Sequence, residues 1–289
     1  RYTSPVITGF GGTAATQSTC STLGGVTITI TGTSFGPAGH SDGLQAVYGT
    51  DAVADKYSAT SCSVVSQTSI SCNTVAGVGG NLRWTVTVAG QDSVQSGATI
   101  SYALPTLSGL SGDAVSGRST TSGGMAISLS GNFFGPASQT EVVAQYGPDG
   151  TLTKYSAVSC SVVSQTSITC QTVAGVGTSL KWRVGIGGQF SESLSSPMTS
   201  YAVPTVSVVN GAKLMNTVGG QKYTITGANF GPPGTVVVGK YMNSFNIEYT
   251  ATACQISTGH DEIRCESARG EGKDFFWTVK IGGQTSALS

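Results

Sequence analysis

The sequence predicts an all-β protein made of three similar sandwich domains joined in an extended rod. Three observations support this: a long internal repeat, strands that alternate apolar and polar residues, and a composition rich in small polar residues. Residues 61–79 read SCSVVSQTSISCNTVAGVG, and residues 159–177 differ from them at only two of nineteen positions. Glycine, serine and threonine together make up roughly two fifths of the chain.

The repeat divides the chain into three units. Its third, more divergent copy contains Cys254 and Cys265, followed by Trp277 at the position of two earlier tryptophans. A Tyr-x-x-Pro sequence opens each unit, and 289 residues suit two or three ordinary domains. The predicted domains are 1–102, 103–201 and 202–289.

Within each unit the strands have a period of two. After a Gly-Gly turn, Val26, Ile28 and Ile30 alternate with threonines, and a later strand alternates Leu82, Trp84, Val86 and Val88 with polar residues. A Gly-x-x-Phe-Gly-Pro corner follows the first of these strands at 32–37, 131–136 and 227–232. No segment has a helical stripe. Many short strands with frequent turns predict an immunoglobulin-like sandwich whose large apolar rings lie between two sheets.

The order of these motifs resembles one family. The series Pro-x-(Ile/Val), Gly-Gly, an alternating strand, Gly-x-(Ser/Asn)-Phe-Gly, paired cysteines and Val-x-Val-x-Gly-Gly is similar to the IPT/TIG family of immunoglobulin-like domains, three times over. Members of this family occur in plexin-like receptor ectodomains, in bacterial and protist surface proteins, beside starch-processing catalytic domains and in some transcription factors. The resemblance implies the fold and leaves the function open.

Six of the seven cysteines form three close pairs, and the spacing predicts a disulfide in each unit. The paired residues are Cys62 with Cys72, Cys160 with Cys170, and Cys254 with Cys265. Two antiparallel strands around a Ser-Gln-Thr-Ser turn would bring such cysteines opposite each other, and disulfides imply an extracellular or cell-surface location. Buried free thiols in a cytosolic protein are the alternative. Zinc needs more ligands than two cysteines per unit provide.

Cys20 has no counterpart, because the aligned residue of the second unit is Ser119. An odd cysteine in a secreted protein suggests a disulfide to another chain. A buried thiol is the equally weighted alternative.

The junctions between the units are short and contain no flexible spacer. Tyr102 and Tyr201 each precede a proline by three residues, so the connection is stiff. Each tyrosine packs either across the junction or in a domain core. Arg1 and Tyr2 match the end of a preceding unit, which suggests an excerpt from a longer tandem array. A boundary chosen by an experimenter is the competing explanation.

The charge balance excludes two classes of partner. Fourteen basic and fourteen acidic side chains give a net charge of zero, and only 10% of residues are charged. We therefore expect neither nucleic-acid binding nor attachment to an anionic membrane, and we find no apolar run long enough to insert into one. A neutral surface favours self-association. Ser/Thr density also permits O-glycosylation.

Catalytic, cofactor-binding and metal-binding residues are not predicted. His40, Ser41 and Asp42 are consecutive, so they cannot form a triad. The acidic pairs Asp51 with Asp55 and Asp261 with Glu262 lack calcium-loop spacing.

Three hypotheses about function remain. The leading one is a non-enzymatic extracellular structural protein, a stalk or filament subunit whose partners are copies of itself. The second is a receptor or adhesin that binds a protein or glycan through loop aromatics. Phe133, Tyr241 and Phe245 are candidates, and core packing explains them equally well. The third is an accessory module of a carbohydrate-active enzyme.

Overall fold

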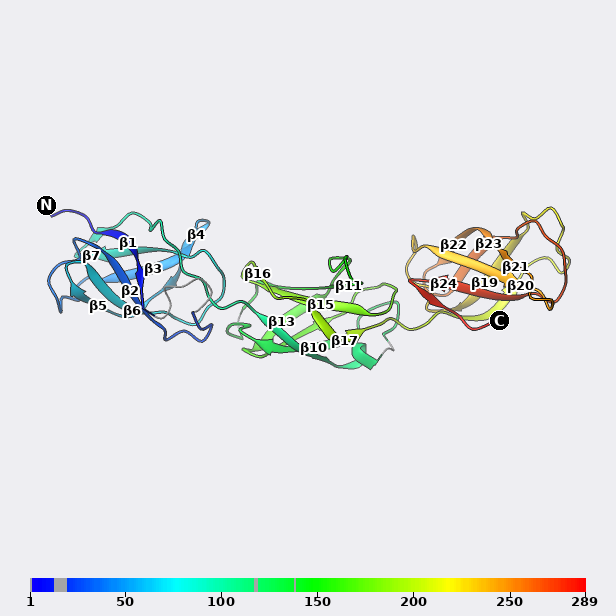
Figure 1. Ribbon diagram of the computed structural model, residues 1–289, viewed down its shortest axis with the longest axis horizontal. Coiled ribbons are helices and arrows are strands. Elements are labelled where there is room, and N and C mark those ends of the chain that lie inside the picture. Colours follow the sequence, from blue (N-terminus) through cyan, green and yellow to red (C-terminus); the bar gives the residue numbers. More distant parts are fainter. Residues whose placement is uncertain (1, 13–19, 117–118, 138) are drawn as a thin grey trace.

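The molecule consists of three β-sandwiches that follow one another along its longest axis (Figure 1). The computed structural model describes residues 2–12, 20–116, 119–137 and 139–289. Within these ranges the secondary structure consists of strands and one short 3-10 helix. The predicted all-β class and the predicted three tandem sandwiches are confirmed.

The first domain has two antiparallel four-stranded sheets, in the orders β1-β2-β6-β5 and β4-β3-β7-β8. Its strands are β1 (Val6–Gly11), β2 (Thr27–Thr33), β3 (Gln45–Thr50), β4 (Val53–Ser58), β5 (Thr60–Ser66), β6 (Ser69–Asn73), β7 (Arg83–Val88) and β8 (Gln91–Asp92). This arrangement matches the two sheets of an immunoglobulin-like sandwich.

The second and third domains repeat both sheet orders, and the second domain adds a fifth strand to one sheet. The second domain contains β9 (Thr106–Ser111), the 3-10 helix η1 (Asp113–Ser116), β10 (Ala126–Asn132), β11 (Val142–Gly147), β12 (Tyr155–Ser156), β13 (Val158–Ser164), β14 (Ser167–Gln171), β15 (Leu180–Ile186), β16 (Gln189–Phe190) and β17 (Leu194–Thr199). The fifth strand, β17, also pairs with β15. The third contains β18 (Thr205–Asn210), β19 (Lys222–Ala228), β20 (Val237–Met242), β21 (Glu248–Thr250), β22 (Thr252–Thr258), β23 (Glu262–Glu266), β24 (Phe276–Ile281) and β25 (Gln284–Thr285).

Each core lies between the two sheets of its domain, as the alternating pattern predicts. In the first domain Ile28 and Ile30 of β2 are fully buried against Trp84 and Val86 of β7. The Tyr48 ring of β3 stacks on Trp84 with centroids 4.2 Å apart, and Tyr146 stacks on Trp182 in the same way. Burial of these rings contributes the largest apolar areas of the fold.

The three predicted cysteine pairs form disulfides in the structure. Each joins neighbouring strands of a hairpin, β5 to β6, β13 to β14 and β22 to β23, with Cα atoms 4.0–4.1 Å apart. Each disulfide therefore links two neighbouring strands of the same sheet, whereas the disulfide of antibody domains links the two sheets.

Candidate functional site

The described residues contain no group of three or more His, Cys, Asp or Glu side chains placed to hold a metal ion. No helix in the described part of the chain has the length and apolarity to cross a membrane. The absence of a catalytic site remains a prediction. The features that recur in this molecule are the joints between its domains, and these form the candidate site.

The first element of each joint is the tyrosine of the connecting segment, which belongs to the core of the domain before it. The Tyr102 hydroxyl donates to the Val75 carbonyl at 2.6 Å, and the Tyr48 hydroxyl lies 2.7 Å from it. Because a hydroxyl carries one proton, Tyr48 donates to Tyr102. Tyr201 repeats these contacts with Val173 and Tyr146. Both connecting tyrosines are buried, which decides between the two sequence interpretations in favour of core packing.

Burial also changes the acidity of these groups. Desolvation raises the pKa of Tyr48 to about 12, and it raises the pKa of Tyr102 beyond the usual range, with a further contribution from Tyr48 itself. Both hydroxyls therefore stay protonated at any physiological pH. The pair is a neutral structural contact and supplies no acid or base.

The second element is a valine that packs against the glycine corner of the following domain. Val78, in the loop between β6 and β7, belongs to the core cluster of the second domain. A Cβ atom on Gly135 would lie 2.3 Å from Val78 Cγ1, so this position requires glycine. Val176 and Gly231 reproduce that geometry at the second joint, also at 2.3 Å. We call Val78 and Val176 the knobs, and Gly135 and Gly231 the sockets.

A tyrosine holds each knob loop in place. The Tyr57 hydroxyl donates to the Val78 carbonyl at 2.8 Å and accepts from the Val78 amide at 3.0 Å. Tyr155 makes the same two bonds to Val176. The knobs are therefore presented rigidly, with their backbone groups satisfied.

The third element is a turn of the following domain that contacts the backbone of the domain before it. A Cβ atom on Gly187 would lie 2.9 Å from the Gly79 nitrogen, and Gly282 stands in the same relation to Gly177 at 2.7 Å. Two residues later, Gln189 Nε2 donates to the Tyr102 carbonyl at 3.2 Å. At the second joint Gln284 Nε2 donates to the Tyr201 carbonyl at 3.0 Å.

Polar side chains around the contact differ between the joints. At the first, Thr22 Oγ1 donates to Gln165 Oε1 at 2.6 Å, and Lys56 pairs with Glu141 at 3.0 Å. At the second, Thr121 Oγ1 and His260 Nδ1 are hydrogen-bonded at 2.9 Å. The apolar and backbone contacts are thus the repeated part of the joint, and the polar rim varies.

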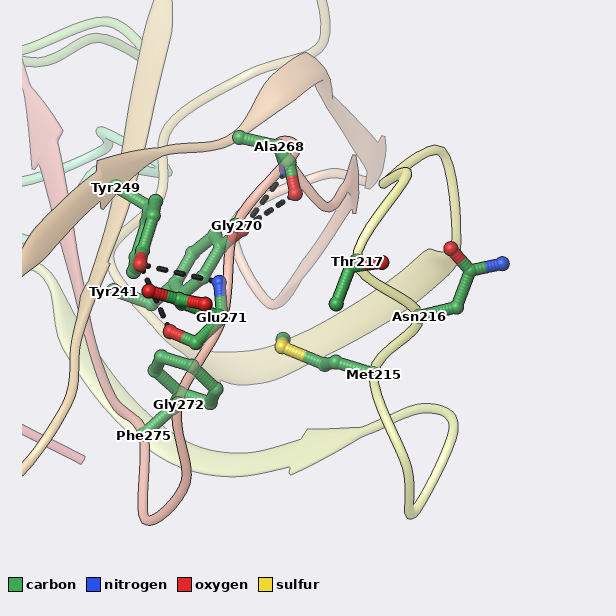
Figure 2. Close-up of a pocket in the computed structure, with 10 residues that line it drawn as sticks. All are labelled: Met215, Asn216, Thr217, Tyr241, Tyr249, Ala268, Gly270, Glu271, Gly272 and Phe275. Carbon is green, nitrogen blue, oxygen red and sulfur yellow. Dashed lines mark hydrogen bonds between the residues drawn. The ribbon is translucent and has the colours of Figure 1, made fainter.

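The third domain presents the knob side of a joint at its far end, and this surface contains a cavity of about 90 Å³ (Figure 2). Tyr249 holds the loop through both backbone groups of Glu271, which stands where the other domains have a valine knob. Tyr241 and Met215 line the cavity, at the positions of Tyr48 and Cys20. By alignment, the cavity lies near the position of Tyr102 and Tyr201 in the first two domains. The Phe275 ring packs edge-on against Tyr241 and Tyr249 and occupies part of that space.

The first domain presents the socket side at the opposite end. A shallow pocket of about 450 Å³ is lined by Tyr2, Gly36, His40 and Gln67, among others. Gly36 aligns with the sockets Gly135 and Gly231, and a Cβ atom on it would meet nothing within 4 Å. The Tyr2 side chain is 91% exposed. Arg1 lies outside the described residues.

The seventh cysteine lies inside the first domain. Cys20 is fully buried, forms no disulfide with another cysteine of the described chain, and pairs through its backbone with the Tyr102 segment. Burial raises the pKa of its thiol to about 11, which suppresses the reactive thiolate. Both facts favour the interpretation as a buried thiol. The disulfide to another chain stays a prediction.

The three candidate loop aromatics differ in how exposed their side chains are. Phe133 and Phe245 are exposed, Phe245 to 71%. Tyr241 follows the alternative of core packing, because its ring is buried against Trp277. Its alignment with Tyr48 and Tyr146 was the signal that could have identified it as a core residue.

Comparison with known proteins agrees with these motifs. The family model described as IPT/TIG domain matches residues 12–102. The first domain is an IPT/TIG domain. The second and third IPT/TIG-like units share its sheet order, its hairpin disulfide and its corner motif. The chain is therefore a tandem array of IPT/TIG-type modules.

Solved structures with tandem modules are similar at low identity. The plexin A4 extracellular region is 16% identical over 94% of this chain with a TM-score of 0.30, and the chain spans 21% of its length. The Escherichia coli adhesin FdeC is 12% identical, with 97% and 92% of the two chains covered and a TM-score of 0.26. Similarity at this level says nothing about function. A search of curated proteins found no significant match.

The disulfides bear on location. Disulfides form and persist in oxidising compartments and are rare in the cytosol. One disulfide in each of the three IPT/TIG-type modules indicates an extracellular or cell-surface protein.

Proposed function

We propose that this chain is a structural segment of an extracellular protein, a stiff stalk or the repeating subunit of a surface or secreted filament. The observation that carries the proposal is that the same apolar knob, socket and glutamine contact recur at both joints. A joint with defined packing limits bending between domains, because bending would pull a buried valine out of its socket.

Other features support the same proposal. The buried connecting tyrosines tie each junction to the core before it, so the linker has no freely rotating part. The disulfide in each module constrains the unfolded chain, contributing about 2.5–3 kcal/mol per module in the chain-entropy model. Such modules suit a role that carries load. The near-neutral surface favours association with further copies.

Small-angle X-ray scattering of the full chain tests the stiffness. The unmodified chain should scatter as a rod with one dominant set of inter-domain angles. Gly135→Ala places a Cβ atom against Val78, so it should open the first joint and broaden the distribution of maximum dimensions. Scattering from the unmodified chain that matches freely jointed domains would contradict the proposal.

The matched control is Gly36→Ala. Gly36 and Gly135 occupy the same corner with φ of 89° and 81°, so alanine costs about 1–2 kcal/mol of left-handed backbone strain at either position. Only Gly135 has a knob in contact. Gly36→Ala should therefore leave the scattering of the rod unchanged.

A second candidate function is adhesion through the loop between β20 and β21. It is favoured by one observation, the 71% exposure of the Phe245 ring at that loop. Exposed aromatic rings are frequent anchors in glycan and protein binding. Binding of the full chain to a glycan array, lost in Phe245→Ala and kept in the equally exposed Val94→Ala, would favour this role over the structural one.

A further inference from the structure

Tension along the molecule pulls the two ends of the second domain in opposite directions, because a neighbouring domain is attached at each end (Figure 1). The chain enters this domain at the joint between Val78 and Gly135 and leaves it at the joint between Thr121 and His260. We propose that the first and second domains resist tension through a parallel contact between their entering and leaving segments. This inference rests on the proposed structural function and assigns the residues that carry the load.

The entering and leaving segments of the second domain run side by side in the same direction. The entering segment begins at Thr106, which pairs with Asn132 next to the socket corner, and it reaches Ser119 two residues before the contact with the third domain. The leaving segment follows β17, and its Tyr201 forms a parallel bridge with Ser119. Tension pulls the entering segment towards the first domain and the leaving segment towards the third. The two segments are therefore loaded in shear, along their length.

Backbone hydrogen bonds join the two segments. In the second domain the Ala202 amide donates to the Ser119 carbonyl at 2.8 Å. In the first domain the Ala103 amide donates to the Cys20 carbonyl at 2.8 Å, and the Cys20 amide donates to the Ser101 carbonyl at 3.3 Å. We call these bonds the clamp. They cross the direction of pull, so tension loads them together, whereas two segments pulled apart from one end lose their bonds one after another.

The leaving segment is also held on its other side. The Tyr201 amide donates to the Gly177 carbonyl at 2.9 Å, and the Tyr102 amide donates to the Gly79 carbonyl at the same distance. Both tyrosine rings are buried in the core of their domain. Extraction of a leaving segment therefore breaks bonds on both of its sides and exposes a large aromatic ring to water. The connecting tyrosine anchors the clamp.

The disulfides lie outside the loaded segments. Cys160 and Cys170 join β13 to β14, which are neither entering nor leaving strands. The disulfide therefore carries no load until the clamp has broken, and it then keeps its own loop closed. Unfolding of the second domain should release about 90 residues, an extended length of roughly 300 Å before the folded length is subtracted. Reduction of the disulfide should add about 35 Å.

Force spectroscopy of single full-length chains, held by handles at their two ends, tests the proposal. Ala103→Pro removes the amide that binds the Cys20 carbonyl, so unfolding of the first domain at constant force should accelerate at least tenfold.

The matched control is Ala59→Pro in the same domain. Ala59 is half-buried like Ala103, and its amide donates one backbone bond, to the Ala46 carbonyl at 2.9 Å. This bond lies outside the loaded segments, so it is still intact when the clamp breaks, and the unfolding rate under force should change less than twofold. Equal acceleration by the two proline variants would overturn the proposal.

A change in the direction of pull tests the clamp without altering it. One handle is attached at Thr120→Cys, an exposed position next to Ser119, and the other stays at the C-terminal end. Tension then separates Ser119 from Ala202 at one end of the contact, so the leaving segment peels away bond by bond. The second domain should unfold at least tenfold faster than it does between the two chain ends at the same force.

The two pulling directions also separate this inference from the proposed function. Equal unfolding rates in both directions, from a chain that scatters X-rays as a rod, would reject the clamp and leave the stiff stalk intact. Scattering from freely jointed domains would contradict the stalk, and the ratio of the two unfolding rates would still decide whether the clamp carries the load.

Discussion

The first and third domains differ at the same place, the end that faces the next domain. In the first, Tyr102 fills the space beside Tyr48 and Cys20, and its ring is fully buried. In the third, the Phe275 ring occupies part of the corresponding space and a small cavity remains beside Tyr241 and Met215. The comparison teaches that a module of this kind takes its last core residue from the connecting segment. The connecting tyrosine therefore belongs both to the core of its module and to the joint.

The largest expected effect comes from giving the first domain the cavity of the third. Tyr102→Ala removes a fully buried aromatic side chain, which costs about 3–5 kcal/mol of unfolding free energy. Hydrogen exchange of peptides from each domain, measured in increasing denaturant, should show the loss in the first domain. Tyr102→Phe should cost only about 1 kcal/mol, because Tyr48 then binds the Val75 carbonyl as Tyr241 binds Ala268.

Tyr2→Ala is the matched control for that experiment, since it removes the same side chain from an exposed position. Its effect on unfolding of the monomeric chain should stay within about 0.5 kcal/mol. Equal losses for the two alanine variants would mean that Tyr102 is not a core residue, and the comparison between the domains would fail.

The role of Tyr102 could not be inferred from sequence alone. The repeat, the alternating strands and the cysteine pairs are local patterns, so they predicted the sandwiches and the hairpin disulfides. Val78 and Gly135 are far apart in the chain, and their contact depends on how two folded domains meet. Tyr241 stayed open between a loop tip and the core, and its alignment with the buried Tyr48 would have favoured the core. Boundaries at 102 and 201 remain a proposed division, and the core that includes Tyr102 crosses into the junction.

At high pH we expect the first domain to lose stability before the second. The folded pKa of Cys20 is raised from 9.0 to about 11, so the unfolded chain loses this proton first and stability falls as the pH rises from about 9 to 11. Ser119 occupies this position in the second domain and does not titrate. Denaturant unfolding between pH 8 and 11 should show the first domain losing stability at lower pH than the second.

Cys20→Ser is the control, and it should remove the early part of that loss. The buried tyrosines of both domains, with Tyr48 raised to about 12, add a further decline above pH 10 that the variant keeps. The same pH dependence with and without Cys20 would contradict burial of the thiol.

The smallest expected effect concerns the central tryptophans. Trp182 Nε1 donates to Thr199 Oγ1 at 2.8 Å, whereas the buried Trp84 Nε1 has no partner among the described residues, with Ile100 at the equivalent position. Thr199→Val makes the second domain resemble the first. Leaving the indole N–H unpaired costs about 1–3 kcal/mol, and the added methyl group returns part of this, so a net loss of about 1 kcal/mol is expected.

Domain-resolved hydrogen exchange should place that loss in the second domain and leave the first unchanged. Thr199→Ser keeps the hydroxyl acceptor and removes the methyl group, so it separates the hydrogen bond from the packing. If valine is tolerated better than serine, apolar packing at this position outweighs the hydrogen bond, and the first domain loses nothing by having Ile100 there. If serine is tolerated better, the hydrogen bond contributes more than packing at this position. The first domain then accepts an unpaired indole N–H because Ile100 packs beside Tyr102, and burial of Tyr102 contributes more stability than the missing hydrogen bond.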